Sequence, residues 1–208
     1  MSATDLFAAL GIALALCAAW LRVFCRLSGR SRPIPASVKV ITLMIFVLLL
    51  IPIPGMGMAL AAFFRGFSAD LSITLMALCV LSLVRSLRGA TTVNQREFMV
   101  LMCAIAAAAL LLYPAALGWG DWDAYRLGWG ASWGSWVFLL TLAIVCATSW
   151  LSGSRVIPAF IAMALLAWSL GLMESANLWD YLLDPWLSVF ALSFVFIKCL
   201  RVAFSFWR

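Results

Sequence analysis

The sequence predicts an all-α, polytopic membrane protein: a transmembrane helical bundle of about seven helices, with its amino terminus outside the cytoplasm and its carboxyl terminus inside. Of the 208 residues, 66% are hydrophobic and 11% charged, whereas roughly a quarter of a soluble domain is charged. The charged residues also leave seven uncharged intervals, which are 6–21, 40–64, 71–84, 98–120, 127–154, 156–173 and 185–197. A bilayer must therefore surround most of the chain.

Two of these intervals are short for a crossing. A helix needs about 20 apolar residues to span a hydrocarbon core of about 30 Å, and intervals 71–84 and 185–197 fall below that length. Arg85, Lys198 and Arg201 at their ends have long stems, which can carry the charge back to the headgroups while the backbone stays in the apolar layer. Both intervals are therefore counted as crossings.

The basic residues predict the orientation, because Lys and Arg near helix ends are retained in the cytoplasm. Twelve of the fourteen follow alternate intervals: Arg22, Arg26, Arg30, Arg32, Lys39, Arg85, Arg88, Arg96, Arg155, Lys198, Arg201 and Arg208. The opposite segments contain only Arg65 and Arg126, together with Asp5, Asp70, Asp121, Asp123, Glu174, Asp180 and Asp184. The formal charge of +6 thus belongs to the cytoplasmic face, and no nucleic-acid partner is predicted.

The first helix is expected to be retained and closely packed. Residues 6–21 lack the basic segment that precedes the apolar part of a signal peptide. Gly11, Ala15 and Ala19 recur at four-residue spacing, and Ala9, Ala13 and Cys17 form a neighbouring ridge. Small residues in register allow close backbone approach, either inside the monomer or against a partner subunit.

The second helix is expected to end or kink near Pro52. Two prolines remove backbone donors there and two glycines loosen the backbone; these residues are Pro52, Pro54, Gly55 and Gly57. Residues 59–67 are too apolar for an ordinary loop, so we expect an interfacial or partly re-entrant stretch before Asp70 opens the third helix.

Local capping signals mark two later helices. Asn94 with Glu97 has the spacing of a capping box, which would begin the fourth helix. Asp184 followed by Pro185 has the N-cap and N1 pattern, which would begin the seventh. No linker separates a soluble part, so residues 1–208 are interpreted as a single integral membrane domain.

The residue types present argue against several chemistries. The chain contains no histidine, which disfavours bis-His haem ligation, most catalytic zinc sites and His-based acid–base catalysis. The six cysteines lie in or beside apolar stretches without a C-x-x-C pair, so we interpret them as packing residues. No charged residue falls near the predicted bilayer midplane, where proton-coupled transporters place one. We therefore predict no cofactor and no metal, and assign no catalytic residue.

The predicted external surface is rich in tryptophan. Residues 117–136 contain five of the eleven tryptophans: Trp119, Trp122, Trp129, Trp133 and Trp136. The last three fall at i, i+4 and i+7 and would form one stripe if the fifth helix began early, and Trp179 and Trp186 lie at the same external level. One interpretation is an aromatic belt at headgroup depth. The other is a recognition surface for a partner helix, a lipid headgroup or a glycan.

The external acids form two groups in the sequence, Asp121 with Asp123, and Glu174 with Asp180 and Asp184. The Asp-Trp-Asp triplet resembles the D-x-D pattern that holds a divalent cation in some sugar-transferring enzymes. A three-residue pattern also arises by chance, and the chain offers no large soluble portion to hold a donor substrate. These acids are therefore predicted to form part of a ligand or partner surface.

Three functional hypotheses remain open at this stage. We expect a non-catalytic membrane subunit or scaffold of a larger cell-envelope complex in the bacterial inner membrane, with the lipid bilayer and a membrane protein as partners. The first alternative is a small transport, solute-binding or lipid-binding component that uses the external surface and the break at residues 52–57. The second is an enzyme that modifies a lipid or glycan through the external carboxylates. The position of the two acid groups in space would discriminate among them.

Overall fold

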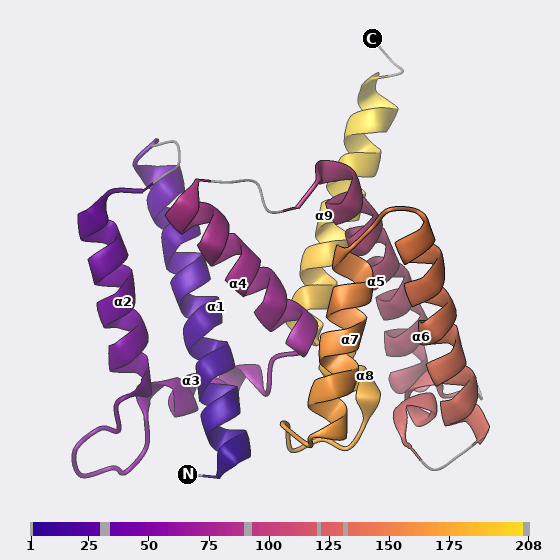
Figure 1. Ribbon diagram of the computed structural model, residues 1–208, viewed down its shortest axis with the longest axis horizontal. Helices are drawn as coiled ribbons and strands as arrows, with labels where there is room; N and C mark the ends of the chain where they lie inside the picture. The colour runs from indigo at the N-terminus through magenta and orange to yellow at the C-terminus, as the bar shows by residue number, and fades with distance from the viewer. Residues whose placement is uncertain (1, 30–33, 90–92, 120–121, 131–132, 206–208) are drawn as a thin grey trace. The chain divides into compact units, whose positions relative to one another are not determined.

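The computed structural model describes residues 2–29, 34–89, 93–119, 122–130 and 133–205, and in these residues it is all-α (Figure 1). Its elements are α1 (Ala3–Leu27), α2 (Ala36–Leu50), α3 (Leu60–Ser68), α4 (Ile73–Arg88), α5 (Gln95–Ala116), the 3-10 helix η1 (Ala124–Gly128), α6 (Trp133–Leu151), α7 (Val156–Ser169), α8 (Leu178–Leu182) and α9 (Pro185–Ser205). No strand is present in the described ranges. The predicted all-α class is confirmed.

Four of these helices are suited to crossing a membrane by their length and composition. They are α1, α5, α6 and α9, with 25, 22, 19 and 21 residues. The apolar helices α2 and α7 are shorter. Large apolar side chains such as Leu43, Leu48, Leu140 and Ile144 are exposed on α2 and α6, a pattern that suits contact with lipid. The chain is a helical, multi-pass membrane protein.

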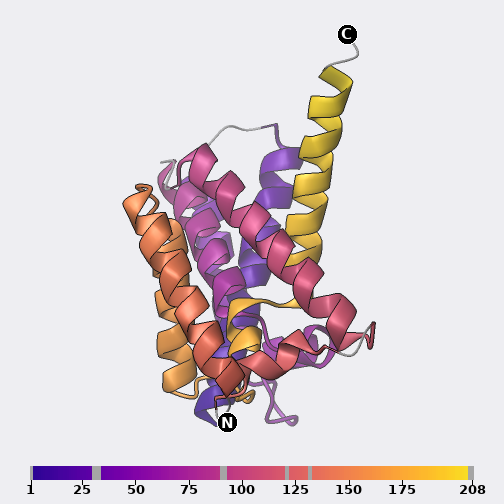
Figure 2. The same ribbon diagram turned by 90° about the vertical axis from the view of Figure 1, so that its right-hand side faces the viewer.

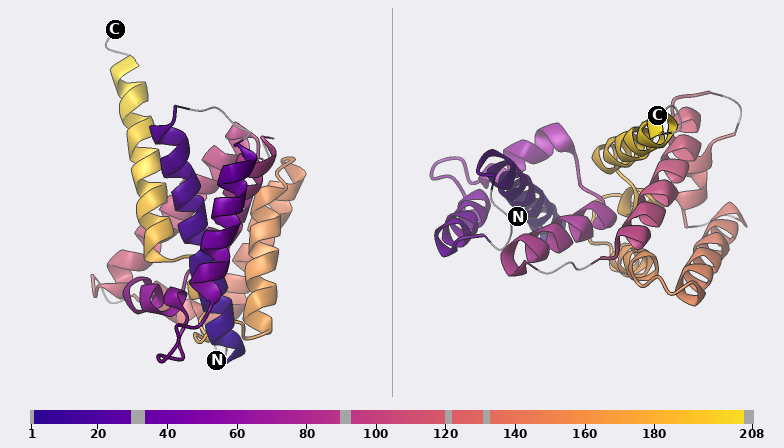
Figure 3. Two further views of the ribbon diagram at one scale, coloured as in Figure 1. Left: turned by 90° about the vertical axis from the view of Figure 1, so that its left-hand side faces the viewer. Right: turned by 90° about the horizontal axis from the view of Figure 1, so that it is seen from above.

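The helices group into two compact units. The first contains Met1–Thr92 and Leu170–Glu174, and in it α1 packs against α2, α3 and α4. Figures 1 and 3 show α3 lying crosswise to α1 and α2. The second contains Val93–Ser169 and Ser175–Arg208. There α5 packs along α9, and α6 packs on α7 and η1 (Figure 2).

The two small-residue ridges of α1 are buried to different extents in the first unit. Gly11 is buried, but Ala15 is half-buried and Ala19 is exposed. The neighbouring ridge of Ala9, Ala13 and Cys17 is fully buried, and the Sγ of Cys17 lies 3.7 Å from the carbonyl oxygen of Thr42 in α2. At Gly11 a Cβ would lie 2.9 Å from the Sδ of Met76 in α4, so the absence of a side chain there permits the approach of α4.

A short closed loop joins α2 to α3. The helix α2 ends at Leu50, and Pro52 and Ala59 form an isolated antiparallel bridge. Within the loop, the N–H of Ile53 donates to the carbonyl oxygen of Met58 at 2.9 Å. Gly55 and Gly57 have positive φ values of 85° and 65°, which glycine adopts without steric cost. The loop therefore satisfies part of its own backbone before α3 begins.

Side-chain caps begin several helices. Asn94 caps α5 by accepting from the N–H of Arg96 at 3.1 Å, and Asp184 caps α9 by accepting from the N–H of Leu187 at 2.8 Å, so both predicted helix starts are confirmed. Glu97 binds elsewhere: its Oε1 accepts from the N–H of Arg155 at 2.9 Å. This bond joins the start of α5 to the turn between α6 and α7.

Within each unit, contacts join segments that the charge pattern assigns to the same side of the membrane. In the first unit, an apolar cluster of Leu21, Ile34 and Val38, with Leu83 and Leu87 against it, joins the end of α1, the start of α2 and the end of α4. Those three segments are all predicted to be cytoplasmic.

Candidate functional site

The predicted external segments of the second unit are joined by one buried asparagine. Asn177 is 0% exposed, and its Oδ1 accepts from the N–H of Trp179 at 3.0 Å, which caps α8. Its Nδ2 donates to the carbonyl oxygen of Tyr125 in η1 at 2.9 Å. The backbone N–H of Asn177 donates to Ser175 Oγ at 3.0 Å. We call Ala124, Tyr125, Gly128, Ser175, Asn177, Trp179 and Asp180 the loop core.

Gly128 makes this close approach possible. A Cβ at Gly128 would lie 1.7 Å from Asn177 Oδ1 and 2.8 Å from the Cδ1 of Trp179. The next residue, Trp129, forms an isolated antiparallel bridge with Asn177. Any side chain at position 128 would therefore separate η1 from the segment that begins α8.

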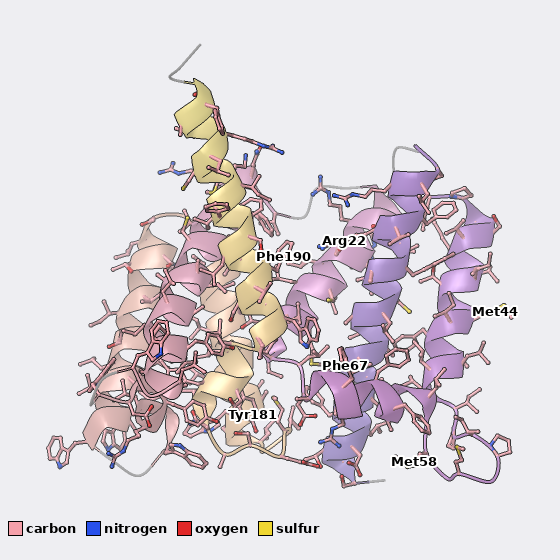
Figure 4. The ribbon with its side chains drawn as sticks, turned by 180° about the vertical axis from the view of Figure 1, so that it is seen from behind. Arg22, Met44, Met58, Phe67, Tyr181 and Phe190 are labelled. Atoms are coloured by element: carbon pink, nitrogen blue, oxygen red, sulfur yellow. The ribbon has the colours of Figure 1, made fainter. Side chains whose placement is uncertain are left out.

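Trp179, which is predicted to lie at the external level, is part of the interior of the second unit. It is 5% exposed, and its Nε1 donates to the carbonyl oxygen of Ala124 at 3.0 Å. The indole stacks on Phe138 of α6, with ring centroids 4.4 Å apart and an interplanar angle of 28°. The buried Tyr181 (Figure 4) donates from its hydroxyl to the carbonyl oxygen of Ser175 at 3.0 Å.

Tyr125 and Asp180 form the polar pair of the loop core. The hydroxyl of Tyr125 donates to Asp180 Oδ2 at 2.8 Å, and Ser175 Oγ donates to the same oxygen. Burial, together with the negative charge of Asp180, raises the pKa of Tyr125 to about 12, since both disfavour the phenolate. Asp180 is thus engaged by two hydroxyl groups of its own chain.

Each of the other predicted acids that the structure describes has a partner of its own. Asp123 caps η1 by accepting from the N–H of Tyr125 at 2.9 Å. Asp184 is 3% exposed and caps α9. Glu174 groups with the first unit, and Asp121 lies outside the described residues. In the described part of the chain, no three Cys, Asp or Glu side chains gather as a metal site.

Arg65 organises the acids of the first unit. It pairs with Asp5 at 2.8 Å, Asp70 at 2.6 Å and Glu174 at 2.9 Å. Hydrogen bonds to Asp70 and Glu174 raise the pKa of the guanidinium further above its ordinary value, so Arg65 remains charged throughout the biological pH range. No role for Arg65 is predicted from the sequence, although its position as a lone base among acidic segments is a signal for such pairing.

The five tryptophans of residues 117–136 are exposed, but three of them do not form the predicted stripe. Trp133 and Trp136 lie on the first turn of α6, whereas Trp129 precedes that helix and follows η1. The bridge to Asn177 holds Trp129 extended, and its ring meets the ring of Tyr125 edge-on at 6.2 Å. Trp119 and Trp122 are exposed in the α5–η1 connection.

Compared with known proteins, the chain matches no family model, no curated protein and no solved structure. The function must therefore be argued from this geometry. Asp123, Asp180 and Asp184 are hydrogen-bonded within the chain, while Trp133 is 90% exposed. In this arrangement the aromatic side chains are accessible, while the carboxylates hold the surrounding chain in place.

The loop core should be sensitive to loss of the Asn177 side chain. We expect Asn177→Ala to lower the free energy of unfolding by about 2–4 kcal/mol, because the N–H of Trp179 and the carbonyl of Tyr125 lose buried partners. The control is Asn94→Ala, which removes an exposed cap and should cost about 1 kcal/mol. Unfolding of the purified protein by SDS would measure both, and equal losses would contradict the role of Asn177.

We expect the folded protein to lose stability at high pH as Tyr125 loses its proton. Its pKa of about 12 lies above the ordinary value near 10, so the folded state retains its proton longer than the unfolded chain. The stabilisation should be complete below pH 10 and should decline as the pH rises from about 10 to 12. Thermal unfolding in detergent over this range should show the decline, which Tyr125→Phe should reduce. Identical pH profiles would contradict this assignment.

Proposed function

We propose that this chain is a non-catalytic, seven-span subunit of a larger membrane complex, and that it presents the exposed tryptophans of residues 117–136 to a membrane-protein partner. One observation carries the proposal: Asp123, Asp180 and Asp184 are hydrogen-bonded within the chain, while the five tryptophans of residues 117–136 remain on the surface. Buried aromatic anchors dominate the energetics of many protein interfaces, and exposed indoles can supply them.

The bonding of the acids favours a subunit over an enzyme. A catalytic carboxylate must reach a reacting atom within hydrogen-bonding distance. Asp180 accepts from Tyr125 and Ser175, and Asp184 is 3% exposed at the start of α9. Either residue would have to give up a structural hydrogen bond or become exposed in order to act on a substrate.

Transport has less support than a subunit role. Irregular backbone at membrane depth usually lines a cavity or lies within protein. Here residues 54–58 are exposed and form part of a closed loop. The helix break at Pro52 to Gly57 therefore resembles an ordinary helix connection, and no contact of the described residues favours a substrate path.

Seven crossings in the predicted orientation agree with the contacts inside each unit. Arg65 joins the predicted external segments at Asp5, Asp70 and Glu174, and Glu97 joins two predicted cytoplasmic segments by accepting from Arg155. The helices α2, α4 and α7 contain 15, 16 and 14 residues, or about 21–24 Å at about 1.5 Å per residue. Lys39 in the first turn of α2 and Arg85 in the last turn of α4 have long stems that can reach the headgroups.

Affinity purification tests the subunit proposal. The chain, tagged and expressed at its native level, should elute from mild detergent with a stoichiometric membrane protein identified by mass spectrometry. We expect the double variant Trp133→Ala, Trp136→Ala to lose that protein, because both exposed indoles are removed. The control is Trp150→Ala, which removes an exposed indole from the other end of α6 and should retain it. A chain that elutes alone, without a partner captured by crosslinking in cells, would overturn the proposal.

Reporter insertions test the seven crossings. Alkaline phosphatase is active only outside the cytoplasm, so it should be active when inserted after Gly55 or Gly118 and inactive after Gly29, Gly89 or Gly153. These positions lie in connections between helices and have positive φ values, where an insertion disturbs little packing. Activity after Gly89, or inactivity after Gly118, would require a different number of crossings.

A further inference from the structure

The short helix α3 has its large apolar side chains on the outside. Leu60, Phe63, Phe64 and Phe67 are 40%, 49%, 41% and 80% exposed, whereas Ala61 is 0% exposed. At 3.6 residues per turn the four large residues share one face, and Ala61 lies toward the opposite side with Arg65. On the surface of a soluble protein a helix usually turns its apolar face toward the core, whereas α3 turns its apolar face outward.

The length and direction of α3 exclude it as a crossing. Its nine residues extend about 14 Å at about 1.5 Å per residue, which is half of a hydrocarbon core of about 30 Å. It also lies crosswise to α1 and α2 (Figure 3). An apolar face on such a helix is suited to a boundary between water and hydrocarbon.

We propose that α3 is an interfacial anchor, with the face formed by Leu60, Phe63, Phe64 and Phe67 covered by phospholipid of the outer leaflet. Interfacial helices place such a face at the boundary between headgroups and acyl chains. Arg65 and its partners Asp5 and Asp70 lie at headgroup depth. The inference goes beyond the proposed subunit role and takes from it only the external side of α3.

The surroundings of α3 favour lipid over a protein partner. Its one charged side chain, Arg65, is already engaged by three carboxylates of the first unit. Neighbouring apolar side chains are exposed as well: Met56 and Met58 in the preceding loop, Val47 and Leu48 in the last turn of α2, and Ile51 directly after it. Figure 4 shows Met44 on the outer side of α2 and Met58 in that loop. Acyl chains can cover such a surface without any directional polar contact.

Photocrosslinking in native membranes tests the anchor. Benzoylphenylalanine would replace Phe63 or Phe67, one at a time, in the full-length chain, and mass spectrometry would identify the adducts after irradiation. We expect phospholipid adducts at both positions. Their yield should be comparable to that obtained when the same photocrosslinker replaces Met44. The control position is Gln95, which is exposed at the start of α5. Benzoylphenylalanine at that position should give no phospholipid adduct. Vesicles of phosphatidylethanolamine and phosphatidylglycerol should reproduce the result with purified protein.

The other outcomes separate this inference from the proposed function. Protein adducts at Phe63 and Phe67 would show that a partner covers α3, and the anchor would be wrong. No adduct at these positions, while Met44 gives phospholipid, would place α3 in water and would also overturn it. If the photocrosslinker at Met44 also gave no phospholipid adduct, that result would instead contradict the placement of α2 in the membrane. Two independent positions are used so that one misfolded variant cannot decide the result.

Discussion

The structure depends on one constraint, which is that a chain surrounded largely by hydrocarbon must satisfy its own polar groups. The bilayer core offers no water to an unpaired N–H or C=O, so helices dominate and their ends need partners. Ser2, Ser72, Asn94 and Asn177 supply side-chain caps. Inside the helices, the hydroxyl groups of Thr42, Thr141 and Thr148 donate to carbonyl oxygens of the preceding turn. Polar side chains therefore supply partners for backbone N–H groups at helix ends, and inside the helices each of these hydroxyl groups finds an acceptor in the preceding turn.

The same constraint explains why each unit has its own polar centre near the predicted external surface. In the first unit, one guanidinium satisfies three carboxylates, and in the second, Asn177 satisfies backbone groups of η1 and α8. Charged side chains suit the first centre because its members remain partly exposed, with Arg65 at 21% and Glu174 at 62% of side-chain area. A neutral amide suits the second because Asn177 is fully buried, and burying a charge costs far more than burying an amide that is hydrogen-bonded.

Tryptophan has two roles in this chain, and the indole N–H distinguishes them. Trp179 is buried with an acceptor for its Nε1 and with Phe138 against its ring, so it behaves as a core residue. Trp133 and Trp136 are exposed at the start of α6, where an amphipathic ring can occupy headgroup depth or meet a partner. Composition alone assigns both kinds to the same aromatic belt, because it contains no information about which carbonyl groups lie nearby.

The sequence by itself determined the helical membrane class, the end of α2 near Pro52 and the helix starts at Asn94 and Asp184, because these depend on local hydrophobicity and on bonds within a few residues. The side of each segment remains a prediction from charge. Only the tertiary structure decided that Ala9, Ala13 and Cys17 are more deeply buried than Ala15 and Ala19, that Trp129 lies off α6, and that Glu174 pairs with Arg65. Gly128 and Asn177 are 49 positions apart along the chain, and no periodicity connects residues at such a separation. Their contact exists because α6 and α7 return the chain to η1, and long-range packing of this kind determines which acids and indoles remain available for function.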